Sequence, residues 1–284
     1  MASKQQLRTT VTDLLKINHP IILAGMNVAA GPKLAAAVTN AGGLGVLGGI
    51  GYTPDMLREQ IAELKSFLDD KNAPFGVDLL LPQVGGSARK TNYDYTKGKN
   101  VDLDLGVDII CAQGGEGGGH TGDVPTTVLI PAVVELCKGK TSPMSGKPVQ
   151  VVAAGGIFNG ATVAAALMLG ASAVWVGTRF ILTDEAGAPK AHQEAVRTAG
   201  HDDNIRTIIF TGRPLRVRNN SYIQNWEENR DDIDDETMDN ARPFLMGKAA
   251  AVVNEKKSAK AVVDELVSDA VACIHKGEKL TAKL

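Results

Sequence analysis

The stretch "VQVVAAGGIFNGATVAAALMLGASAVWVGTRF", residues 149–180, contains the pattern that decides the fold. Two short apolar runs, 149–157 and 173–180, flank a helical pattern of small and aliphatic residues. This alternation is typical of a β-α-β unit whose two strands run parallel. Each apolar run ends in small residues, so the carboxyl ends of two consecutive strands carry little side-chain bulk.

Four more apolar runs, at 20–26, 44–50, 75–81 and 107–113, have strand length. Helical patterns follow most of them, at 32–43, 53–68 and 127–138, and Thr53 and Pro54 form a helix-start signal. Strands that are apolar on both faces indicate a parallel sheet covered by helices. A doubly wound open sheet and a (β/α) barrel both fit, but six strand ends with small or polar groups favour a barrel mouth.

The composition limits the classes of partner. The 284 residues carry a formal net charge of −2 and only 4% aromatic side chains, which disfavours nucleic acid and anionic lipid as partners. The three cysteines form no CxxC pair, so we expect neither a metal site nor a disulfide framework. No apolar run has the length of a signal peptide or a membrane span. We therefore expect a soluble, cytoplasmic protein that binds a small molecule.

Two glycine patterns match GxGxxG, at 43–48 and 117–122, but neither has the context of a nicotinamide-binding fingerprint. The pair of strand ends within 149–180 is more informative. Backbone N–H groups at Gly155, Gly156, Gly177 and Thr178 can surround a phosphate without obstruction by side chains, although tight turns alone would also use these glycines.

A third glycine-rich segment, "CAQGGEGGGHTG" at 111–122, follows the apolar run that ends near Gln113. Glycines allow the backbone to approach a planar ligand closely, and the imidazole of His120 can exchange a proton near neutral pH. A structural or surface role is the alternative for a single histidine. Its position in this loop favours catalysis or substrate contact.

These motifs together resemble the nitronate monooxygenases, formerly called 2-nitropropane dioxygenases, and especially the fungal-type members. The resemblance rests on "PIILAGM", "FGVDLLLP", "DIICAQGGEGGGHTG", "VVAAGGIFNGATVAAALMLGA" and "VGTRF". It implies an FMN-containing TIM barrel, residues 1–284 as one domain, and 181–247 as a region that covers the substrate. It also implies oxidation of alkyl nitronates or nitroalkanes with O2 to a carbonyl compound and nitrite, and it is compatible with a homodimer.

The resemblance also implies roles for individual residues. His120 would lie beside the flavin as the base or the group that orients the substrate. The flavin ring and ribityl chain would meet Met26, Asp78 and Gln113, and Gly118 would lie against the cofactor. For Gln113, a side-chain amide that only stabilises the loop is the alternative. The phosphate would be held by Gly155, Gly156, Gly177 and Thr178.

One departure from the family concerns the barrel itself. About two β/α units of the family are absent between the region of "GSARKTNYDYTKGK", 86–99, and the strand at 107–113, and only six of eight barrel strands are readable. Either the chain lacks these units, or later segments such as "IRTIIFTG", 205–212, complete the sheet in another way. The fold expected is therefore an α/β, TIM-like barrel that is shortened or incomplete, with a C-terminal helical segment. A flavin-dependent NAD(P)H:quinone or enoyl-thioester reductase, and a truncated flavin-binding paralogue without activity, remain as alternatives.

Overall fold

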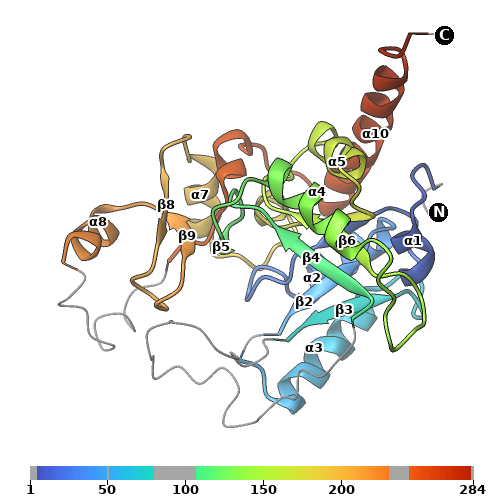
Figure 1. Cartoon of the computed structure of the whole chain (residues 1–284). Helices are drawn as coiled ribbons and strands as arrows, with labels where there is room; N and C mark the ends of the chain where they lie inside the picture. The colour runs from blue at the N-terminus through green and yellow to red at the C-terminus, as the bar shows by residue number, and fades with distance from the viewer. Residues whose placement is uncertain (1–4, 50, 80–106, 230–242, 283–284) are drawn as a thin grey trace.

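A computed structural model describes residues 5–49, 51–79, 107–229 and 243–282 (Figure 1). Four parallel strands form one sheet in the order β1 (Ile21–Leu23), β7 (Ala173–Val176), β6 (Gln150–Ala154) and β4 (Ile109–Gln113). A second parallel pair consists of β2 (Gly45–Gly48) and β3 (Phe75–Asp78). All six strands predicted from the sequence are present.

The two sheets join beside β1. Leu44 donates its N–H to the Ile21 carbonyl, and Leu23 donates to the Leu44 carbonyl, each at 2.9 Å. The strands therefore follow one order, β3-β2-β1-β7-β6-β4. Among the described residues, β3 and β4 pair with no further strand on their outer edges. Because a closed barrel of this type has eight strands, the described residues form a TIM-like barrel that is not closed, in agreement with the predicted fold class.

Helices cover the outer face of this array. They are α2 (Pro32–Asn40), α3 (Pro54–Phe67), α4 (Thr126–Cys137), α5 (Gly160–Met168) and the long C-terminal α10 (Ala259–Glu278). Thr53 caps α3 by accepting the N–H of Met56 at 3.3 Å, as its sequence signal predicts. The helix α10 packs against α5 and α2, and its Leu266 joins the main core with Leu34 and Val163.

The inner face of the array has its own small core. Ile22 and Val152 point inward, and Val11 of α1 (Thr10–Leu15) packs against them and is fully buried. The hydroxyl of Thr10 lies 3.2 Å from Ser172 Oγ, directly before β7. The helix α1 thus closes the end of the array at which the strands begin.

The segment after β7 lies at the other end (Figure 1). It begins with α6 (Thr178–Ile181) and α7 (Lys190–Arg197), followed by an antiparallel hairpin of β8 (Asn204–Thr207) and β9 (Leu215–Arg218). The short strand β5 (Gly119–His120) pairs with β9. The helix α8 (Ser221–Glu228) and the 3-10 helix η2 (Lys248–Val252) complete this end. No helix among the described residues is long and apolar enough to cross a membrane.

The inner face is open to solvent at β4. Along this strand Ile110 and Ala112 pack outward in the main core, so Ile109, Cys111 and Gln113 face inward. Cys111 is nevertheless exposed. Protein atoms around its thiol still desolvate it and raise its pKa to about 12. Among the described residues no strand pairs with the outer edge of β4, and this open edge accounts for the exposure.

This open flank predicts the alkylation pattern of the native protein. Cys111 should react with iodoacetamide, whereas the buried Cys137 should react only after denaturation. Because the thiolate is the reactive form, the rate at Cys111 should rise about tenfold for each pH unit between 7 and 9. Peptide mass spectrometry would measure both sites. If Cys111 reacts only in denaturant, the flank between β3 and β4 is covered in solution.

Candidate active site

The glycine-rich loop after β4 is fixed at both of its ends. Gly114 donates its N–H to the Ala154 carbonyl at 2.9 Å, and Gly115 donates to the Val124 carbonyl at 2.7 Å. Gly118 has no room for a side chain, because a Cβ there would lie 2.6 Å from the backbone N of Gly247. One reason for a glycine at this position is therefore close contact between two backbone segments.

Residues 244–248, here called the strap, make that contact. Gly247 donates its N–H to Thr178 Oγ1 at 2.9 Å, and Lys248 donates its N–H to the Glu116 carbonyl at 2.9 Å. Met246 is buried with only 1% of its surface exposed. His192 stacks on Phe244 and its Nε2 donates to the Leu245 carbonyl at 2.7 Å. The strap thus connects the glycine loop to the end of β7.

Glu116 lies in the glycine loop and caps α4. Its carboxylate accepts the N–H of Thr126 at 3.0 Å and the Thr126 hydroxyl at 2.8 Å. A carboxylate at the N-terminus of a helix satisfies a free N–H and interacts favourably with the helix dipole. The contact fixes the loop relative to the helix that follows it.

His120 lies at the far end of the loop in β5. Its Nε2 lies 3.0 Å from the hydroxyl of Thr211, and Gln113 donates its side-chain N–H to the His120 carbonyl at 2.7 Å. The residue remains exposed, yet surrounding atoms lower the pKa of its imidazole by desolvation, and the charge of Arg213 lowers it further. A lowered pKa keeps the ring neutral, and therefore able to accept a proton, at neutral pH.

Backbone N–H groups converge at the ends of β6 and β7. These strands pair in register, Ala154 opposite Trp175, so Gly155 lies one residue and Gly177 two residues beyond paired positions. Gly155 and Gly156 have φ values of 90° and 72°, which favour glycine. Among the described residues, the N–H groups of Gly155, Gly156, Gly177 and Thr178 donate to no protein acceptor. Unpaired amides at adjacent strand ends fit an anion such as a phosphate.

Met26 and Asp78 reach the same end of the array from β1 and β3. The sulfur of Met26 lies 3.6 Å from where a Cβ on Gly177 would be. The side chain of Asp78 packs against Gly25, where a Cβ would lie only 2.2 Å from Asp78 Cβ. Burial raises the pKa of this carboxyl group. The predicted site residues therefore lie at the end where the strands finish.

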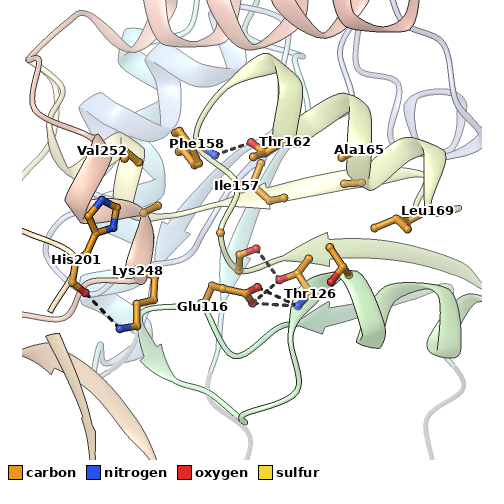
Figure 2. A pocket seen from close by; sticks show the side chains of 15 residues that line it. Glu116, Thr126, Ile157, Phe158, Thr162, Ala165, Leu169, His201, Lys248 and Val252 are labelled. Atoms are coloured by element: carbon orange, nitrogen blue, oxygen red, sulfur yellow. Dashed lines mark hydrogen bonds between the residues drawn. The ribbon is translucent and has the colours of Figure 1, made fainter. Parts of the chain in front are cut away.

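A pocket of about 400 Å³ lies beside this end, between α4, α5 and η2 (Figure 2). Gly155 and Gly156 form part of its wall, while Ile157, Ala165 and Leu169 make much of the rest apolar. Figure 2 shows Glu116 and Thr126 joined on one side and Lys248 hydrogen-bonded to the His201 carbonyl on another. Neither His120 nor Gln113 lines this pocket.

Several contacts at the site were not expected from the sequence. Thr211 and Arg213 approach His120 from the hairpin, and the strap binds Thr178. Sequence patterns seldom reveal such contacts, because they join segments about 70 to 90 residues apart. Glu116 lies ten residues before Thr126, too far for a capping pattern, so its contact with α4 also had no local signal.

Comparison with known proteins identifies the family. The sequence model described as nitronate monooxygenase matches residues 8–103 and 99–269. A carboxyl-CoA dehydrogenase of Mycobacterium tuberculosis, (3aS,4S,5R,7aS)-5-hydroxy-7a-methyl-1-oxo-octahydro-1H-indene-4-carboxyl-CoA dehydrogenase, is 33% identical over 78% of this chain and 69% of its own length. A probable nitronate monooxygenase of Staphylococcus saprophyticus is 27% identical over 87% of this chain and 88% of its own length. That alignment spans 326 positions, more than the 284 residues here, so the relative contains residues without a counterpart.

Solved structures share the architecture. FabK from Thermotoga maritima has a TM-score of 0.77 at 28% identity, covering 97% of this chain and all of its own. A nitroalkane oxidase from Streptomyces ansochromogenes has the same TM-score at 23% identity, covering 94% of this chain and 99% of its own, which supports the fold alone. From the family match over most of its length, this chain belongs to the nitronate monooxygenase family of oxidoreductases.

Proposed function

We propose that the protein binds FMN and oxidises alkyl nitronates with O2 to a carbonyl compound and nitrite. The observation that carries this proposal is the placement of a proton-accepting imidazole, His120, at the end of the array that also presents unpaired amides at Gly156 and Thr178. Family membership supports the same reaction. Bound FMN would supply the acceptor for substrate electrons and then pass them to O2.

Each part of the rim has a proposed role. The amides of Gly155, Gly156, Gly177 and Thr178 would hold the phosphate, and the Thr178 hydroxyl, which accepts from Gly247, retains its own proton to donate. Met26, Asp78, Gln113 and Gly118 would contact the flavin ring or its ribityl chain. Residues 181–247, of which 230–242 lie outside the described residues, would cover the substrate, and their hairpin lies against β5.

The role of His120 depends on the substrate. A neutral nitroalkane must lose a proton from carbon, and the neutral imidazole would accept it while Thr211 fixes the ring. A preformed nitronate has already lost that proton. For this substrate His120 would only orient the reacting group.

The similarity to FabK and to a carboxyl-CoA dehydrogenase supports a second candidate, a flavin-dependent reductase of acyl thioesters. Anaerobic mixing of the purified yellow protein with NADH or with ethylnitronate separates the two. Bleaching of flavin absorbance by ethylnitronate, with nitrite formed in air, supports the oxidase reaction. Bleaching by NADH alone supports the reductase, and bleaching by neither supports an inactive flavin-binding protein.

Substitution of Gly156 tests the phosphate site. Gly156→Asp should weaken FMN binding at least about tenfold relative to Gly156→Asn, because only the former places a negative charge beside the phosphate; a tenfold change is ~1.4 kcal/mol. Asparagine is the matched control, since both side chains have similar size and tolerate a φ of 72°. Fluorescence titration of the flavin-free protein measures both. Equal affinities would refute a phosphate at Gly156.

Substitution of His120 tests the proton transfer. His120→Asn should retain flavin and lower turnover of nitroethane by about 100-fold, with a smaller loss for ethylnitronate. The exposed His275 of α10 offers a control, and His275→Asn should leave both rates unchanged. Nitrite release measures each rate. Equal losses on both substrates would show that His120 only orients the substrate.

The pH profile gives an independent check on the same residue. Because the pKa of His120 is lowered, the neutral ring predominates at pH 6.5 and above. The kcat/KM for nitroethane should therefore rise with pH through an apparent pKa below 6.5 and level off above it. His120→Asn should abolish that ionisation, and a profile that keeps it would assign the ionisation to another group.

A further inference from the structure

Four arginines lie on the β8–β9 hairpin or on its connecting turn, beside β5: Arg206, Arg213, Arg216 and Arg218. Three of them have partners for their guanidinium groups. Arg206 pairs with Asp123 at 3.5 Å, Arg216 donates to the Gly115 carbonyl at 2.9 Å and to Asn204 Oδ1 at 3.0 Å, and Arg218 pairs with Asp203 at 3.2 Å. These contacts fix the hairpin to the glycine loop and to itself.

Arg213 differs from the other three. It is half-buried, and in the described part of the chain its guanidinium has neither an ion pair nor a hydrogen bond. A charged side chain is costly to desolvate without a partner. This cost is offset when an anionic ligand occupies the site.

The turn that carries Arg213 lies directly against His120. Thr211 contacts His120 Nε2 at 3.0 Å, and Thr121 donates its N–H to the Pro214 carbonyl at 3.2 Å. His120 is also opposite Leu215 in the β5–β9 ladder. These three contacts fix the turn before and after Arg213. The positive charge of Arg213 lowers the pKa of the His120 ring.

We propose that Arg213 is a specificity-determining residue that binds the anionic end of the substrate beside His120. The site then selects substrates with a negative charge on the reacting group, as in a nitronate, over neutral nitroalkanes of the same size. A guanidinium suits the two oxygens of a nitronate, since it can donate two parallel hydrogen bonds to them. This inference rests on the proposed function.

Kinetics of the flavin-loaded enzyme test the selectivity. Arg213→Gln should raise KM for ethylnitronate at least about tenfold and change KM for nitroethane less than about twofold. Arg213→Lys, which keeps the charge, should recover most of the loss. Arg206→Gln is the matched control because it removes one paired arginine from the same hairpin, and it should leave the ratio of the two KM values unchanged. Equal changes in KM for both substrates would overturn the proposal.

A binding measurement separates this inference from the proposed function. Nitrite, a small anion with two oxygens, should perturb the His120 ring resonances in NMR spectra of the wild-type protein, with affinity that falls as salt rises. Arg213→Gln should abolish that perturbation and raise the pKa of His120. If nitrite binds equally well to the variant, Arg213 does not form the anion site, whether or not the protein oxidises nitronates. If wild-type protein oxidises no nitronate but binds nitrite only with Arg213, the anion site stands and the proposed function fails.

Discussion

The parallel hydrogen bonding between β6 and β7 is the constraint on which the candidate site depends. Its register, Ala154 opposite Trp175, places Gly155 one residue and Gly177 two residues beyond paired positions. A slip of one residue would shift one strand end by about 3.3 Å and turn its side chains to the other face. The amides at these two ends would then no longer face one ligand. Burial of both faces, by α5 outside and by Val11 of α1 inside, opposes such a slip.

The strap makes the rest of the site depend on this pair. It takes one hydrogen bond to Thr178 at the end of β7 and one to the carbonyl of Glu116 in the glycine loop. Glu116 in turn caps α4, so these hydrogen bonds join the end of β7, the glycine loop that leads to His120, and the start of α4. Such a chain of short contacts positions His120 although its strand, β5, has only two residues. Rigid support of this kind is what a site with defined geometry requires.

The sequence predicted much of this arrangement where local patterns suffice. All six barrel strands, the start of α3 at Thr53 and the helical C-terminus follow from apolar periodicity and capping signals. The resemblance to the family also predicted an incomplete array, because about two of the family's β/α units are absent between the strands that correspond to β3 and β4. The pairing of β5 with β9 was not predicted, because the two residues of β5 are too few to show a periodic pattern. The strap and the contact of Thr211 with His120 depend on tertiary folding, and no local pattern encodes them.

If Arg213 binds the substrate as proposed, the electrostatics around His120 would make an anionic substrate suit this site better than a neutral one. Desolvation and the charge of Arg213 both lower the pKa of the ring, which keeps it neutral but makes it a weaker base. A weaker base removes a proton from carbon more slowly. On the proposed assignment, the same positive charge would stabilise an anion that arrives already deprotonated. The charge of Arg213 would therefore favour a preformed nitronate, while His120 would still serve as the base for a neutral nitroalkane.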